Sequence, residues 1–144
     1  MRRQRIARLF GVLAMSLSSS AVLALVVPTT PQQFDPIKLG EQFGVIVGPI
    51  TEDVRKELSL RLTDGVVVFE VVGSSLAEEA GLKPRVVITE INNRRVHNLK
   101  DFGLLLSEAL AAGNFTVGTW EPTHPENQGA GQQINFYFVP NRTD

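Results

Sequence analysis

The chain has 144 residues, 43% of them hydrophobic and 20% charged, which fits one globular domain of ordinary size and excludes an intrinsically disordered chain. Its net charge of −1 combines 14 basic and 15 acidic residues. Four arginines lie in the first eight positions, so residues 9–144 carry 10 basic and 15 acidic residues, a net of −5. This balance argues against nucleic acid as a partner, because phosphate backbones bind basic surfaces. The absence of cysteine excludes disulfides, cysteine nucleophiles, cysteine-based metal sites and a lipid anchor at a cysteine.

Residues 1–27 have the pattern of a secretory signal, with arginines before an apolar run from Leu9 to Val27. Two interpretations stay open. A short apolar core is cleaved near Ala21 or Ala24, or the whole run is an uncleaved signal-anchor helix, close to the roughly 20 residues that a membrane span needs. Both export the rest of the chain, since the arginines hold the N-terminus in the cytoplasm.

Three further segments follow the apolar run. Residues 28–40 contain three prolines among threonines and glutamines, which predicts an extended linker. Residues 41–140 form the domain, and residues 141–144 are a short tail.

The domain opens with the apolar run Gln42–Val47, which predicts a strand covered on both faces. Gly44 interrupts it where a side chain would block close approach of another backbone. Thr51 then caps the start of a helix, with acidic residues in its first turn. Val66–Val72 is apolar on both faces and predicts a central strand.

A short helix is expected over Gly73–Leu82, followed by a strand over Val86–Ile91. The pair Asn92-Asn93 predicts a tight turn, because asparagine tolerates positive φ. Asn98 caps a longer helix that ends at Gly113.

Two last strands, Phe115–Trp120 and Gln133–Val139, form a hairpin in which Trp120 and Tyr137 are expected to face each other. The elements together predict a mostly β fold with two α-helices, preceded by the N-terminal signal or anchor helix.

The order of motifs resembles a PDZ domain of the bacterial kind, above all those that follow the protease domain in HtrA/Do-like serine proteases. The resemblance extends from Leu39 to Pro140. The matching residues are Phe43-Gly44-Val45, Ile50-Thr51-Glu52-Asp53-Val54, Leu58-Ser59-Leu60, then Gly73, Ser74, Ala77, Ala80, Gly81 and Leu82, and finally Ile88, Ile91 and Asn92.

The sequence departs from the family at two turns. Arg85-Val86 stands where the family has Gly-Asp, and Asn93 stands where it has glycine. The arginine predicts a changed backbone at its turn, and both departures bear on stability more than on binding.

The resemblance implies a partly open β-barrel or sandwich that captures the C-terminal carboxylate of a peptide. The N–H groups of Phe43, Gly44 and Val45 would hold the carboxylate, and the strand from Val45 through Ile46 to Val47 would pair with the peptide backbone. Phe102 and Leu106, four apart on one helix face, would wall the groove. Plain core packing is the alternative for these two side chains, and a simple bulge or turn is the alternative for Gly44.

No catalytic constellation is evident. The only histidines are His97 and His124, neither has metal-ligand spacing around it, and no Gly-x-Ser-x-Gly stretch occurs. We therefore expect no metal, no cofactor and no enzymatic activity.

The sequence thus predicts a non-catalytic peptide-binding module on the periplasmic side of the bacterial inner membrane, either anchored or secreted. Its expected partners are the C-termini of exported or membrane proteins, the membrane itself through the N-terminal segment, and a separate protease or secretion complex. The alternatives are an anchored scaffold subunit of a secretion or membrane assembly, and a regulatory remnant of an HtrA-like protease.

Overall fold

The computed structural model describes residues 34–122 and 133–140, which belong to one compact unit. The predicted signal or anchor segment 1–27, His124 and the tail lie outside these residues. Among the helices that the structure describes, none has the length and apolar character that crossing a membrane requires.

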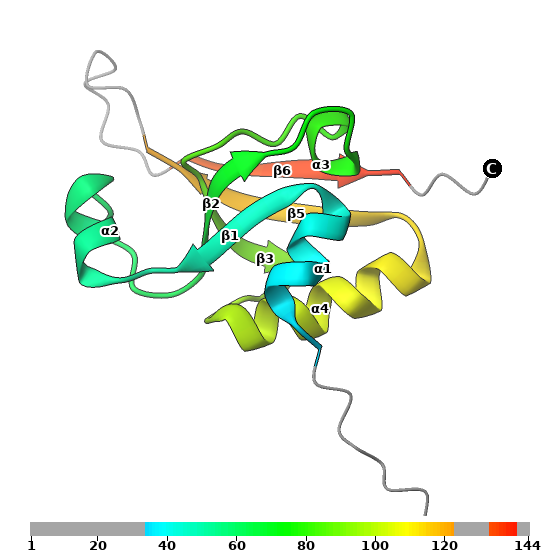
Figure 1. The fold of residues 1–144 in the computed structure, drawn as a ribbon, viewed down its shortest axis with the longest axis horizontal. Helices are drawn as coiled ribbons and strands as arrows, with labels where there is room; N and C mark the ends of the chain where they lie inside the picture. Colours follow the sequence, from blue (N-terminus) through cyan, green and yellow to red (C-terminus); the bar gives the residue numbers. More distant parts are fainter. Residues whose placement is uncertain (1–33, 123–132, 141–144) are drawn as a thin grey trace, which may run out of the picture. The chain divides into compact units, whose positions relative to one another are not determined.

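The described residues form four helices and six strands (Figure 1). The helices are α1 (Pro36–Phe43), α2 (Glu52–Glu57), α3 (Leu76–Glu79) and α4 (Leu99–Ala112). The strands are β1 (Val45–Pro49), β2 (Val66–Val71), β3 (Val87–Ile91), β4 (Arg94–Arg95), β5 (Phe115–Glu121) and β6 (Gln133–Val139). The mostly β character is confirmed, whereas the prediction of two helices is too low for this part of the chain.

All strand pairs are antiparallel, in the order β1-β2-β3-β5-β6, with β4 paired to β3. The central position predicted for β2 is confirmed, since β2 lies between β1 and β3 and its first three valines are completely buried. Among the described strands, β1 and β6 stand at the two ends of this order.

Each face of the sheet carries its own hydrophobic cluster, because neighbouring residues of a strand point to opposite faces. Val66 and Val68 belong to the main cluster, which α4 covers, whereas Val67 belongs to a smaller cluster on the other face. The smaller cluster consists of Leu60, Val67, Val87 and Trp120, with Ile50, Val54, Leu58 and Leu62 packed against it.

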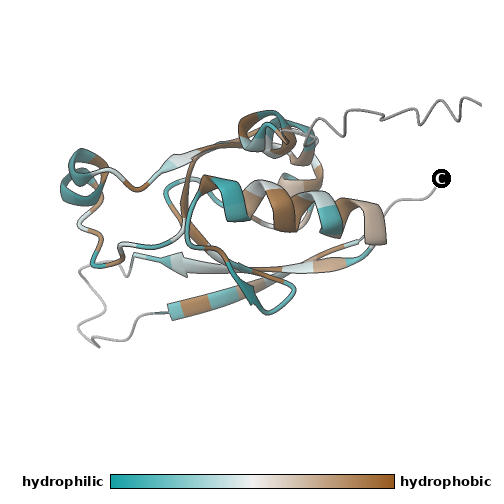
Figure 2. Ribbon diagram, turned by 90° about the horizontal axis from the view of Figure 1, so that it is seen from below, coloured by the Kyte–Doolittle hydropathy of each residue, from teal (hydrophilic) through white to brown (hydrophobic). Residues whose placement is uncertain are grey.

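The helix α4 begins and ends as its sequence predicts. The Asn98 side chain accepts a hydrogen bond from the N–H of Asp101 at 2.9 Å, and Gly113 ends the helix with φ of 112°. Polar and apolar residues alternate along the helix with helical spacing (Figure 2), so one face packs on the sheet.

The helix α1 corrects the prediction for the residues before the first strand. Residues 36–40 were expected to be extended, but they form the first turns of α1, and β1 begins at Val45. Asp35 explains the helix start, because its carboxylate accepts hydrogen bonds from the N–H groups of Ile37 at 3.0 Å and Lys38 at 3.4 Å. Pro36 occupies the first helical position, where its missing N–H is not needed.

The predicted contact between Trp120 and Tyr137 is wrong. Tyr137 lies opposite Val117, and Trp120 lies opposite Ile134. Positions 117 and 120 are an odd number of residues apart along β5, so the two aromatic side chains point to opposite faces of the sheet. Trp120 packs in the small cluster and Tyr137 against the main cluster.

Arg85 and Asn93 both have a backbone conformation that glycine favours. Arg85 has φ of 67° and Asn93 has φ of 61°, both in the left-handed region. The N–H of Arg85 donates to the carbonyl of Val68 at 2.7 Å, which ties this turn to β2. The prediction of a changed backbone at Arg85 stays a prediction, and the observed φ is one that glycine favours.

Candidate peptide-binding groove

The strand β1 offers one unpaired edge. It pairs with β2 on one side and ends the strand order, so its other edge has no strand partner among the described residues. A bulge between Ile46 and Val47 bends it. Val45 and Val47 are buried, but Ile46 is 37% exposed, so the prediction that this strand is covered on both faces is wrong.

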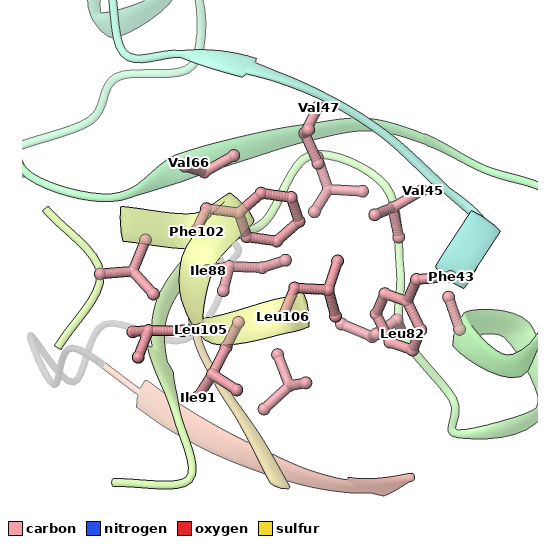
Figure 3. Packing of buried hydrophobic residues seen from close by; sticks show 14 of the residues in the cluster. Phe43, Val45, Val47, Val66, Leu82, Ile88, Ile91, Phe102, Leu105 and Leu106 are labelled. Carbon is pink, nitrogen blue, oxygen red and sulfur yellow. The ribbon is translucent and has the colours of Figure 1, made fainter. Parts of the chain in front are cut away.

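The helix α4 presents a wall of buried residues toward this region. Phe102 and Leu106 have no exposed surface, and Phe102 points toward Val45 and Val47 while Leu106 lies nearer to Phe43 (Figure 3). The five residues Phe43, Val45, Val47, Phe102 and Leu106 belong to one hydrophobic cluster. The structure therefore brings these predicted site residues together, with their side chains packed as core, while their role in peptide binding stays a prediction.

The helix α1 lies between β1 and α4 (Figure 1) and contacts both of them. Glycines allow the close approach on each side. A Cβ added to Gly103 of α4 would lie 2.9 Å from Cβ of Pro36, and a Cβ added to Gly40 of α1 would lie 3.0 Å from the carbonyl oxygen of Val45. The space beside the edge of β1 is thus filled by a segment of the same chain.

Gly44 joins α1 to β1: it ends the helix and also begins the pairing of the strand with β2. Its φ is 108°, and its N–H donates to the carbonyl of Gly40 at 2.8 Å, which ends α1. Its own carbonyl accepts from the N–H of Val72 at 2.8 Å, which begins the pairing with β2. A Cβ at this position would lie 2.0 Å from Oγ of Ser75, so only glycine fits.

Sequence reasoning missed the residues that let α1 pack between β1 and α4, which are Pro36, Gly40 and Gly103. One signal for the helix was present, since an aspartate followed by proline is a typical helix start. The contacts of the two glycines carry no local signal, because they depend on segments far apart in the chain.

The metal-ligand side chains of the described residues do not gather into one site. No group of three or more metal-ligand side chains occurs in the described part of the chain. His97 lies beside α4, where its Nδ1 is 3.1 Å from the carboxylate of Asp101. That carboxylate also accepts from the backbone N–H of His97 at 3.2 Å, so the pair fixes the turn before α4.

Comparisons with known proteins point to one fold. No protein family model and no curated protein matches the sequence. Among solved structures, the HtrA3 PDZ domain bound to a phage-derived ligand (FGRWV) aligns with a TM-score of 0.51 and 18% identity over 68% of this chain and 81% of that one.

Two structures of an HtrA-type protease, AlgW, align as well. AlgW with a decapeptide has a TM-score of 0.54 and 19% identity over 68% of this chain, and a variant with a decapeptide has a TM-score of 0.53 and 19% identity over 69%. The present chain spans 27% of the length of either AlgW chain. The described domain therefore has the fold of an HtrA-type PDZ domain.

Proposed function

We propose that the domain is a non-catalytic module that binds the C-terminal end of a peptide or protein at the groove between β1 and α4. The observation that carries the proposal is the edge of β1 that has no strand partner among the described residues and begins directly after Gly44. Val45 and Val47 of this strand share one hydrophobic cluster with Phe102 and Leu106 of α4. An extended peptide can add to such an edge as a further strand. The HtrA3 and AlgW structures, which have the same fold, each contain a peptide.

The expected affinity is modest. Burying one apolar C-terminal side chain contributes roughly 1.5–3 kcal/mol, and each main-chain hydrogen bond contributes about 0.5–1.5 kcal/mol. Association costs at least several kcal/mol. A micromolar Kd, equivalent to about −8 kcal/mol, is the natural outcome.

The experiment that tests this function is a titration of fluorescent peptides into the purified full-length chain in detergent. Each peptide is used with a free C-terminal carboxylate and as its C-terminal amide, and the last residue is varied. We expect binding that requires the free carboxylate and prefers an apolar last residue. Equal binding of acid and amide would contradict carboxylate capture and favour recognition of an internal motif.

Chemical variation of the peptide is a better test than mutation of the groove. Gly44→Glu and Leu106→Glu would both be expected to stop binding. Gly44 has no room for a side chain and Leu106 has no exposed surface, so either change would also disturb the fold. Loss of binding in these variants would therefore not locate the site.

We also propose that the domain works on the periplasmic side of the bacterial inner membrane. The support is the sequence of residues 1–27, with its early arginines and long apolar run. A fusion of the chain to alkaline phosphatase, which is active only outside the cytoplasm, should be active. The mass of the purified product distinguishes cleavage near Ala21 or Ala24 from an intact anchor. An inactive but abundant fusion would contradict export.

A further inference from the structure

We propose that α1 is an internal occupant of the peptide groove and that a peptide can add to β1 only after α1 has left. This inference rests on the proposed function and concerns the regulation of the same site. It starts from the position of α1, which contacts both walls of the groove.

Steric contacts make the two occupants exclude each other. The carbonyl oxygen of Val45 lies at the edge of β1, and Gly40 approaches it so closely that an added Cβ would be 3.0 Å away. The same Cβ would lie 3.2 Å from Val47 and 3.5 Å from Phe102. No space remains for a peptide backbone, which needs about 4.8 Å between strands.

One hydrogen-bond donor, the N–H of Gly44, is needed both when α1 is in place and when a peptide carboxylate is bound. Gly44 N–H is one of the three groups expected to bind a C-terminal carboxylate, but it donates to the carbonyl of Gly40 at 2.8 Å and so caps α1. One N–H makes one good hydrogen bond, so binding of a carboxylate there requires the cap to open. Peptide capture and loss of the last turn of α1 are therefore coupled.

The helix can leave without unfolding the domain. Its exposed side includes Lys38, Glu41 and Gln42, and within α1 only Gly40 and Phe43 are fully buried. Ile37 and Leu39 are partly buried against the main cluster and would become exposed when the helix leaves. Phe43 lies at the end next to β1, with its ring centroid 5.5 Å from that of Phe115, and it can stay in place as the anchor. An isolated helix of 8 residues is unstable in water, so α1 should lose its helical structure once it is displaced.

Removal of the α1 N-cap provides a test that leaves the groove untouched. Asp35→Ala removes both capping hydrogen bonds, whereas Asp35→Asn keeps an equally good cap and is the matched control. If α1 blocks the groove, its loss of stability appears as tighter peptide binding. We expect the Kd of the tightest free-acid peptide from the library to fall about fivefold in Asp35→Ala and to stay unchanged in Asp35→Asn.

A disulfide provides the opposite test. Pro36→Cys together with Gly103→Cys places two thiols across the contact between α1 and α4 in a chain that has no other cysteine. The two Cβ positions are 2.9 Å apart, so a disulfide requires them to separate by about 1 Å. We expect the oxidised variant to bind the peptide at least tenfold more weakly than the same variant after reduction.

The outcomes separate the inference from the function on which it rests. Two results would overturn the blocking role of α1 and leave peptide binding intact. The first is equal peptide binding by the oxidised and the reduced variant. The second is an unchanged Kd in Asp35→Ala although the Gly44 amide exchanges faster with solvent. Absence of binding in every form, including Asp35→Ala and the reduced variant, overturns the proposed function and this inference with it.

Discussion

Arg85 holds a backbone conformation that glycine adopts without strain. Its φ of 67° is stabilised by a hydrogen bond to another element, since its N–H donates to the carbonyl of Val68 on β2. A left-handed conformation costs a residue with a Cβ about 1–2 kcal/mol. The sequence showed that glycine was missing here, but it did not show that the tertiary hydrogen bond would keep the turn.

Replacing Arg85 with glycine should therefore stabilise the domain. We expect the free energy of unfolding to rise by about 0.5–1 kcal/mol in Arg85→Gly, because the strain removed exceeds the entropy that glycine adds to the unfolded chain. Urea unfolding followed by the fluorescence of the single Trp120 measures it. Asn93→Gly is the matched control and should gain less, because asparagine tolerates positive φ. A loss of stability in Arg85→Gly would show that the arginine side chain stabilises this turn.

Tyr137 and Glu121 form a pair on the last two strands, in which the Tyr137 hydroxyl donates to the Glu121 carboxylate. Burial, together with this hydrogen bond and the negative charge of Glu121, raises the pKa of Tyr137 to about 12. Burial also raises the pKa of Glu121, but hydrogen bonds from Tyr137 and Asn135 and the positive charge of Lys83 together outweigh it, so the pKa of that carboxyl is lowered.

This pair predicts a loss of stability at alkaline pH. Below about pH 10 the hydroxyl is protonated in both the folded and the unfolded chain, and its stabilising contribution is complete. Between about 10 and 12 only the folded chain holds the proton, so stability falls as pH rises. The chain has one tyrosine, so its ultraviolet absorbance gives the titration directly.

We expect a midpoint near 12 in the folded protein, and a lower one in Glu121→Gln, which removes the negative charge but keeps the burial. A midpoint near 10 in a protein with native circular dichroism would refute the pair.

Gly44 is the residue on which the junction of α1 and β1 depends. Ser75 cannot move away from an added side chain, because its hydroxyl donates to Val72 at 2.6 Å and accepts from Glu78 at 3.2 Å. Gly44→Ala should lower the free energy of unfolding by about 2–5 kcal/mol, the sum of a left-handed φ and an overpacked contact. Gly73→Ala is the control for this thermal or urea measurement, since nothing lies within 4 Å of its added Cβ. Equal stability of the two variants would contradict the close contact with Ser75.

At the scale of elements, a phenylalanine on α4 and one on β6 contribute differently to the free energy of unfolding. Phe102 has no exposed surface, whereas Phe136 is 58% exposed and its ring lies over Gly118 on the neighbouring strand. We expect Phe102→Ala to cost about 3–5 kcal/mol and Phe136→Ala at most about 1 kcal/mol, the value of a cross-strand pair. Urea unfolding of both variants checks this. A cost above 2 kcal/mol at Phe136 would show that another group covers this side of β6.

The sequence allowed most elements to be predicted, because their signals are local. The run of three valines from Val66 to Val68 predicted a strand buried on both faces. The start and the end of α4 were predicted from Asn98 and Gly113. The failures arose where a local signal had two meanings. Prolines in residues 28–40 indicated a linker, although Pro36 begins a helix, and Gly44 fitted both a strand interior and a helix end.

Register was the second limit, because it depends on the pairing of whole strands. Trp120 and Tyr137 lie near each other in the predicted hairpin, but a shift of pairing by one residue moves a side chain to the other face. The local sequence around Trp120 and Tyr137 does not show which residue lies opposite each of them.

At the scale of the whole molecule, the fold and the state of its groove were not equally predictable. The order of motifs was enough for the PDZ fold, which the likeness to HtrA3 and AlgW structures supports. The position of α1 between β1 and α4 depends on contacts such as Pro36 with Gly103, which lie far apart in the sequence. The seven predicted site residues lie on β1, on α4 and at the junction before β1, and none of them except Phe43 belongs to α1, the segment that contacts both elements.

An amide NMR titration of the full-length chain with a free-acid peptide and with its amide tests the account most directly. We expect the free acid alone to shift the amide signals of Gly44 and Val45, while the amides of residues 37–42 lose their protection from solvent exchange. Shifts confined to other parts of the chain, or identical shifts with the amidated peptide, would contradict carboxylate capture at β1. Binding at β1 with α1 still protected would contradict the blocking role of the helix.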